Sequence, residues 1–253
     1  MSIPLCFMLS LMLGCLADSV EYKKLLRDEI PDIFIYSHMS ERLPETNFGI
    51  CQISADIRRN PEDGLIYLRN ERQASESLRK CLQKSIESGV NVLMFPEHSM
   101  SFRNETLFDE IQALFQTSAN FHNMIILGGT YYDSDRYSRF PVFGGGWTLT
   151  GYKFGSNYYE AEIYKKTGAR PGKNLSILET DYGRFLIVIG VDILNDSVQY
   201  SARRFAAGGA IDGVIVLANS ANSLELLSEC NRLVRHRSMF VLFVNAVSSQ
   251  YGF

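Results

Sequence analysis

The strongest constraint on the fold is an unbroken apolar run in the last third of the chain. Residues Arg184–Asp192 read Arg-Phe-Leu-Ile-Val-Ile-Gly-Val-Asp, and such a run of branched residues predicts a strand buried on both faces. A near-helical pattern over Leu194–Ala207 follows, and Gly208 and Gly209 end it before a second apolar run at Gly213–Ala218. This order predicts a strand, a crossover helix and a parallel strand at the centre of a sheet. Chemistry is then expected at the carboxyl end of the first strand.

The preceding part of the chain also alternates between expected strands and helices. A hairpin-like region opens at Gly144 and continues through Tyr164, and its triple glycine indicates a turn, because no phosphate-loop Lys-Ser or Lys-Thr follows it. The pattern as a whole predicts a layered α/β fold with an antiparallel insertion. The expected strands are Phe48–Ala55, Asn91–Phe95 and Asn123–Gly128, and the expected helices are Glu71–Ser88 and Glu105–Ser118.

The first 46 residues are expected to form a helical segment and a linker, ahead of one main domain over residues 47–253. Ile3–Ala17 is short for a membrane span but has the length of a signal-peptide core. No Lys or Arg precedes it and it continues into an amphipathic stretch, which favours a docked helix. Pro31–Asn47 reads as a surface linker. We therefore expect a cytoplasmic protein without a clear membrane span, and secretion or membrane anchoring through residues 3–17 remains the alternative.

The net charge and the cysteine spacing give no indication of a nucleic-acid partner, a metal site or a disulfide framework. With 25 basic against 28 acidic residues the net charge is -3, so no basic face for nucleic acid is implied. The five cysteines contain no Cys-x-x-Cys pair and are accompanied by only four histidines. The sequence therefore predicts neither a zinc site nor a disulfide framework, and no cofactor.

Candidate site residues follow the expected strands. Glu97 comes just after the strand Asn91–Phe95, at the sheet edge where Asp192 would also lie. Lys166 ends a Tyr-Lys-Lys element, which without other context would indicate a solvated edge. The turn at Gly190, by contrast, carries no nucleophile.

These elements, taken in order, resemble the nitrilase, or carbon–nitrogen hydrolase, superfamily. Phe-Pro-Glu at Glu97, Tyr-Lys-Lys at Lys166 and Ile-Gly-Val-Asp at Gly190 are similar to the superfamily's Phe-Pro-Glu, Tyr-Arg-Lys and Ile-Cys-Tyr-Asp elements. The resemblance covers about Asn47–Phe253 and implies an αββα sandwich, four-layered when paired. It implies that Glu97 is a general base, that Lys166 stabilises an oxyanion, and that Gly190 stands at the nucleophilic cysteine.

The sequence departs from that pattern at three places. Gly190 has no side chain with which to attack a substrate. The path from Lys166 to Pro171 is short where related sequences carry a longer loop with a second glutamate. The chain also stops at Phe253, before the superfamily's last strands, so the expected strand Val241–Val247 would be exposed or would pair with another chain.

Three functions remain open from the sequence. The first is a catalytically degenerate domain that binds a small amide- or nitrile-like ligand or a protein partner. The second is an active amide or nitrile hydrolase whose nucleophile is unconventional, such as Ser197 or a water held by Glu97. The third is a structural α/β scaffold. For any of them we expect a homo-oligomer or a partner chain.

Overall fold

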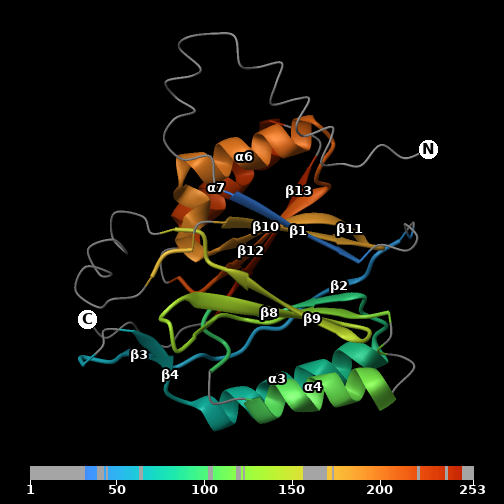
Figure 1. The fold of residues 1–253 in the computed structure, drawn as a ribbon, viewed down its shortest axis with the longest axis vertical. Coiled ribbons are helices and arrows are strands. Elements are labelled where there is room, and N and C mark those ends of the chain that lie inside the picture. The colour runs from blue at the N-terminus through green and yellow to red at the C-terminus, as the bar shows by residue number, and fades with distance from the viewer. Residues whose placement is uncertain are drawn as a thin grey trace.

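The computed structural model is a four-layered αββα sandwich, with two sheets packed face to face and a pair of helices outside each (Figure 1). It describes residues 32–38, 43, 45–62, 65–101, 105–117, 121, 123–155, 170–172, 174–220, 223–236 and 239–246. The expected αββα architecture is confirmed, but all four layers come from one chain, so the expectation that pairing completes them is wrong.

The first sheet is built around the apolar run that dominates the sequence. Its strand order is β1-β10-β11-β12-β13, so β11 lies in the middle, as predicted. The strand β11 pairs in parallel with β12, and the helix α6 connects the two, which confirms the predicted strand–helix–strand unit. The strands are β1 (Asp32–His38), β10 (Asn174–Thr180), β11 (Gly183–Ile189), β12 (Gly213–Ala218) and β13 (Phe240–Asn245), and the outer helices are α6 (Asp196–Ala207) and α7 (Ser223–His236).

The second sheet contains the first half of the alternating pattern and the antiparallel insertion. Its order is β2-β5-β6-β8-β7, and β9 also pairs with β8 in a hairpin that turns at Gly145 and Gly146, where the triple glycine predicted a turn. A separate small hairpin is formed by β3 (Ile57–Arg59) and β4 (Ile66–Leu68). The remaining elements are β2 (Phe48–Ile50), α3 (Glu71–Glu87), β5 (Val92–Met94), α4 (Glu105–Thr117), β6 (Ile125–Leu127), β7 (Tyr131–Tyr132), β8 (Ser138–Gly144) and β9 (Trp147–Tyr152).

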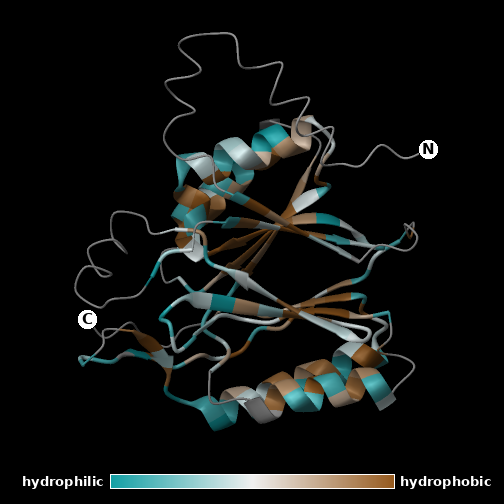
Figure 2. Ribbon diagram, in the orientation of Figure 1, coloured by the Kyte–Doolittle hydropathy of each residue, from teal (hydrophilic) through white to brown (hydrophobic). Residues whose placement is uncertain are grey.

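Three apolar clusters hold the four layers together. One lies between α3, α4 and the second sheet, one between α6, α7 and the first sheet, and the third between the two sheets, where Leu127, Phe185 and Leu217 are fully buried. Figure 2 shows the middle of both sheets coloured predominantly as hydrophobic, whereas the helices carry both colours. Burial of β11 and β12 on both faces explains why these strands have unbroken rather than alternating apolar sequences.

The N-terminal part of the sequence reading needs a correction. Asp32–His38 was expected to belong to a surface linker, but it forms β1, which pairs in parallel with β10 along its whole length. Its sequence, Asp-Ile-Phe-Ile-Tyr-Ser-His, carries enough branched and aromatic residues to extend a sheet edge. The expected helix over residues 3–17 lies outside the described part of the chain. No helix among the described residues is long and apolar enough to cross a membrane.

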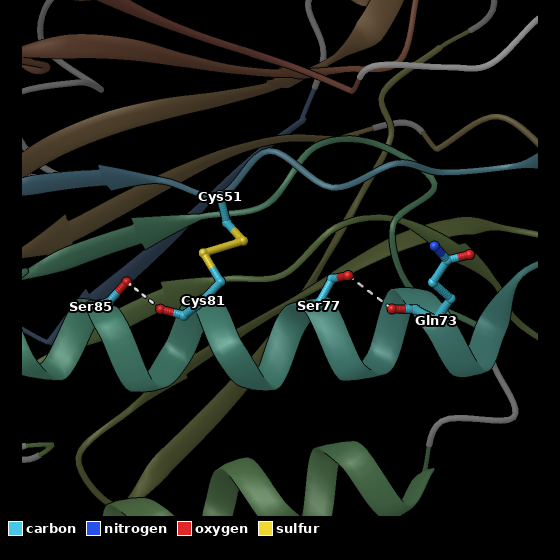
Figure 3. The surroundings of a disulfide bond; sticks show 5 residues. All are labelled: Cys51, Gln73, Ser77, Cys81 and Ser85. Atoms are coloured by element: carbon cyan, nitrogen blue, oxygen red, sulfur yellow. Dashed lines mark hydrogen bonds between the residues drawn. A yellow bond between two sulfur atoms is a disulfide. The ribbon is translucent and has the colours of Figure 1, made fainter.

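A disulfide is the second correction. Cys51, directly after β2, is bonded to Cys81 in α3, and so ties the second sheet to its covering helix (Figure 3). The two cysteines are 30 residues apart in sequence, which is why their spacing gave no signal of a bridge. Their pairing depends on the way α3 packs over β2, a tertiary relationship that sequence spacing does not encode.

Candidate functional site

The candidate site lies where the ends of four strands meet between the two sheets. Glu97 follows β5 and Lys153 follows β9 in the second sheet, while Gly190 follows β11 and Asn219 follows β12 in the first. All four residues are buried. The fold therefore brings strand ends from both sheets together at one point of the sandwich.

An ion pair forms the centre of this site. The ammonium Nζ of Lys153 donates a hydrogen bond of 3.0 Å to Oε1 of Glu97, and each residue is only 5% exposed. Lys153 is placed by the hairpin, because its backbone N–H donates to the carbonyl of Ser138 and so extends the β8–β9 pairing by one residue. A charged pair this deeply buried is charge-balanced and weakly screened by solvent.

The ion pair and its neighbours determine the protonation of Glu97. Burial by itself would raise the pKa of this carboxyl group, but the positive charge of Lys153, its hydrogen bond and a hydrogen bond from the Asn219 backbone outweigh that effect and lower the pKa. Glu97 is therefore a carboxylate at neutral pH. Its Oε1 is already engaged by the ammonium group of Lys153.

His98 is the third ionisable group of the site. Its Nε2 lies 3.7 Å from Oε1 of Glu97, and its backbone N–H donates to Oγ1 of Thr130. Burial lowers the pKa of His98 more strongly than Glu97 raises it, and Lys153 lowers it further. The imidazole is thus neutral at pH 7, which leaves Lys153 as the cation that balances Glu97. His98 also adopts a left-handed backbone with φ of 56°, an uncommon conformation for a residue with a side chain.

Gly190 lies directly against the carboxylate. It has a left-handed backbone with φ of +52°, at the first residue of the short 3₁₀ turn η2 (Gly190–Leu194). A Cβ built on it would lie 2.4 Å from Oε2 of Glu97, closer than any real Cβ contact. Glu97 therefore fills the space that a side chain at position 190 would need.

Asp192 connects the turn after β11 to the segment that follows β9. Its carboxylate, which is 3% exposed, accepts hydrogen bonds from the backbone N–H groups of Phe154 at 2.8 Å and Gly155 at 3.3 Å. The turn after β11 is thereby tied to the two residues that follow Lys153. We conclude that Asp192 helps to fix the position from which Lys153 reaches Glu97.

The predicted site residues have two different outcomes, and one residue of the site was not predicted. Glu97 and Gly190 are brought together, as the sequence predicted. Lys166 lies outside the described residues, so its assigned role stays a prediction. The lysine that contacts Glu97 is Lys153, which the sequence reading missed, although it lies at the end of a hairpin strand and directly follows a tyrosine, a partial likeness to the Tyr-Arg-Lys element.

The described cysteines offer no nucleophile at this site. Cys51 and Cys81 are joined to each other, and Cys230 is buried in α7, where desolvation raises the pKa of its thiol to about 11. Ser197 belongs to the first turn of α6, and its backbone N–H donates to Oδ1 of Asn195. Within the described part of the chain, no group of three or more His, Cys, Asp or Glu side chains could hold a metal ion.

Comparison with known proteins gives structural relatives only. No family model matches the sequence, and no curated protein matches it. A mutant of a Nesterenkonia amidase from the nitrilase superfamily is 11% identical, with a TM-score of 0.57 over 83% of this chain and 78% of that one. A Xanthomonas campestris CN-hydrolase superfamily protein with an arsenic adduct in its active site is 14% identical, with a TM-score of 0.57 over 82% of this chain and 78% of that one.

A glutamine-dependent NAD+ synthetase from Acinetobacter baumannii is also similar, at 17% identity and a TM-score of 0.55. The match covers 79% of this chain and 38% of the synthetase, so the chain spans well under half of that protein. At these identities the likeness concerns the fold rather than the activity. By its layers, its strand order and these neighbours, the chain has the αββα fold of the nitrilase, or carbon–nitrogen hydrolase, superfamily.

Proposed function

We propose that this chain is a catalytically degenerate carbon–nitrogen hydrolase-like domain that acts by binding a ligand or a protein partner. The observation that carries the proposal is the contact between Glu97 and Gly190. A hydrolase of this fold that uses a covalent mechanism needs a nucleophile at the strand-to-helix turn. Here that position has no side chain, and the carboxylate of Glu97 lies only 2.4 Å from where a Cβ would be.

The electrostatics of the site favour the same conclusion. A general base must be able to accept a proton from its nucleophile in the working pH range. The pKa of Glu97 is lowered and its carboxylate is engaged by Lys153. A base with a lowered pKa and a salt-bridged oxygen atom is a weak proton acceptor. The charges of Lys153 and Glu97 thus stabilise each other, and the lysine does not serve to stabilise a reaction intermediate.

Loss of hydrolysis is tested by measuring ammonia release from acetamide, propionamide, glutamine and propionitrile. We expect the full chain and its Glu97→Gln variant to release equal amounts, both at the level of the buffer blank. Steady release by the unmodified chain that disappears in Glu97→Gln would instead support an active hydrolase with a water held by Glu97. Release that disappears in Ser197→Ala would point to Ser197 as the nucleophile.

Binding without turnover is tested with the same small molecules. A compound that binds the folded state raises the melting temperature by mass action, in proportion to the logarithm of its concentration above its Kd. We expect acetamide or propionitrile to raise the melting temperature of the unmodified chain and to have a smaller effect on Lys153→Met. Equal melting curves at all concentrations would remove a small amide or nitrile from the proposal.

The proposed protein partner is a second copy of the chain. The helix α7 exposes three large apolar side chains, Leu224 at 77%, Val234 at 43% and Leu227 at 36%. Next to it, β13 is the terminal strand of the first sheet among the described residues. An apolar helix face beside a terminal strand favours self-association. Light scattering should give a dimer for the unmodified chain and a monomer for Leu224→Glu, and a monomer in both would refute the pairing.

A further inference from the structure

The disulfide carries information about the compartment in which this domain folds. Cys51 is 2% exposed and belongs to the apolar cluster between α3 and the second sheet, and Cys81, in α3, is partly buried against that cluster (Figure 3). Disulfides form and persist in oxidising environments and are rare in the cytosol. A bridge that ties a sheet to its covering helix therefore indicates folding in the secretory pathway. The run Ile3–Ala17, which has the length of a signal-peptide core, is compatible with that route.

A chain that folds there meets the machinery that glycosylates asparagine in Asn-x-Ser/Thr sequences. The sequence contains three such sites, at Asn104, Asn174 and Asn195. Asn104 lies outside the described residues. The structure therefore discriminates between Asn174 and Asn195.

Asn174 is poorly placed to carry a glycan. It is the first residue of β10, where side chains alternate between the two faces of the first sheet. Leu175 packs in the cluster below α6 and α7, so Asn174 and Ser176 are on the opposite face, toward the second sheet. Asn174 itself is partly exposed, but Ser176, the next residue on the same face, is 3% exposed, so this face of the strand is buried from its third residue onward. A bulky oligosaccharide has little room at such a position.

Asn195 is placed differently. It is the N-cap of α6, and its Oδ1 accepts hydrogen bonds from the backbone N–H groups of Ser197 and Val198. Both bonds use the carbonyl oxygen of the side chain and neither uses the amide nitrogen, which diverges from Oδ1 in the planar amide. Asn195 and Ser197 are partly exposed and Asp196 is exposed. A substituent on Nδ2 is therefore compatible with the cap and with the fold.

We propose that Asn195 is an N-glycosylation site and that this domain matures in an oxidising secretory compartment. In the transfer, Nδ2 of Asn195 forms a bond to the anomeric carbon of a lipid-diphosphate-linked oligosaccharide. The bond from that carbon to the diphosphate oxygen breaks, and the amide loses one proton. No oxidant is needed for this step, and the cap bonds through Oδ1 remain in place. The proposal is independent of whether the domain hydrolyses anything.

The test compares the full chain with two variants produced in cultured mammalian cells. Ser197→Ala removes the glycosylation sequence and leaves the capping side chain unchanged, while Asn195→Asp replaces one good cap by another and also removes the acceptor nitrogen. In the chain without substitutions, peptide mass spectrometry after enzymatic glycan removal should show that Asn195 has been converted to Asp. Both variants should lose one glycan in gel mobility and keep the melting temperature of the deglycosylated protein.

Two measurements can overturn the proposal. If Asn195 is unmodified in the protein recovered from these cells, the site assignment is wrong, whatever happens at Asn104 or Asn174. If alkylation before reduction finds Cys51 and Cys81 as free thiols, the compartment assignment is wrong as well. Because neither readout depends on activity, these failures are distinguishable from a failure of the proposed loss of hydrolysis.

Discussion

The carboxylate of Glu97 occupies the space in which a side chain at residue 190 would begin. The distance from its Oε2 to a Cβ built on Gly190 would be 2.4 Å, and Oε1 of the same carboxylate accepts a hydrogen bond of 3.0 Å from Nζ of Lys153. Because these contacts join strand ends of both sheets, Glu97 works as a link between the two sheets. The loss of a side chain at position 190 and the position of Glu97 are thus parts of one arrangement.

The first prediction concerns a methyl group at position 190. Gly190→Ala should destabilise the protein by more than the roughly 1–2 kcal/mol that a Cβ costs in the left-handed region, because Glu97 must also move. Gly209→Ala is the matched control, since Gly209 has φ of +65° and nothing within 4 Å of its Cβ position. Urea unfolding should therefore give a larger loss for Gly190→Ala than for Gly209→Ala. Equal losses of stability would mean that Glu97 moves away from the new methyl group without a loss of free energy.

A double-mutant cycle separates the contact from the backbone effect. If the steric conflict with Glu97 causes the extra loss, Gly190→Ala should be less harmful in a Glu97→Ala background than in the unmodified chain. Glu97→Ala leaves Lys153 buried without its counter-ion and is expected to be strongly destabilising by itself. The informative quantity is thus the coupling between the two substitutions rather than either single value.

The second prediction concerns acid stability. The folded-state pKa of His98 is below its ordinary 6.5 and that of Glu97 is below its ordinary 4.5, so the unfolded chain binds more protons than the folded one in both windows. Each group contributes fully to the free energy of unfolding above its ordinary pKa. This contribution is lost as the pH falls through the lowered pKa of the folded state. The free energy of unfolding should therefore decrease below about pH 6.5 and more steeply below about pH 4.5.

Substitution of the histidine tests the assignment of the upper window. His98→Gln keeps a neutral polar side chain and should abolish the decrease that begins near pH 6.5, while the decrease below pH 4.5 remains. The measurement is urea unfolding at a series of pH values. A profile that is unchanged by His98→Gln would show that other groups cause the upper slope.

The third prediction concerns the disulfide. The bond between Cys51 and Cys81 closes a loop with a sequence separation of 30, for which chain entropy predicts a stabilisation of about 3–4 kcal/mol. The Cys51→Ser/Cys81→Ser variant should be less stable by this amount, and added dithiothreitol should lower the stability of the unmodified chain but not that of the variant. If dithiothreitol lowers the stability of both proteins equally, its effect does not come from the bond between Cys51 and Cys81.

The fourth prediction concerns Asp192 as a positioning residue. Asp192→Ala removes the acceptor of the Phe154 and Gly155 backbone N–H groups, and loss of such hydrogen bonds in a buried setting costs about 1–3 kcal/mol. Amide hydrogen exchange at Phe154 and Gly155 should accelerate, while exchange in α3 should stay unchanged. Asp192→Asn, which keeps one acceptor oxygen, should restore much of the protection. Equal acceleration in α3 would indicate global unfolding instead.

The sequence predicted those parts of the fold whose signals are local. Buried strands such as Gly213–Ala218 have unbroken apolar sequences, and this one has the observed bounds. Helices ended close to their expected residues, and Gly89 adopts the left-handed conformation expected of a glycine that closes a helix. The strand β1 was missed because its pairing with β10 spans more than 100 residues and its neighbours contain prolines.

The site was predicted only in part, for a similar reason. Glu97 and Gly190 follow strong strands, so each could be placed at a strand end, but the structure puts these ends in two facing sheets, β5 in the second and β11 in the first, and not at one sheet edge. The choice between Lys153 and Lys166 depends on where the hairpin strand β9 ends, and strand ends in an antiparallel insertion have weak sequence signals. The bond between Cys51 and Cys81 likewise depends on how α3 lies over β2. Contacts between distant segments are what the sequence reading could not supply.

The fifth prediction concerns a thiol placed beside Glu97. With Gly190→Cys, the new sulfur atom starts from a Cβ position next to Oε2, whereas Lys153 contacts Oε1, so the thiol tests whether Glu97 still accepts a proton despite its lowered pKa. Iodoacetamide at pH 7 should alkylate this thiol faster than Cys230, whose pKa is raised to about 11. Because the lowered pKa makes Glu97 a weak proton acceptor, Glu97→Gln should leave most of this rate unchanged. Peptide mass spectrometry resolves the two sites. Ammonia release from acetamide would then report whether a nucleophile alone restores turnover. A thiol at position 190 that reacts no faster than Cys230, with or without Glu97, would show that this turn no longer has the geometry of a nucleophile site.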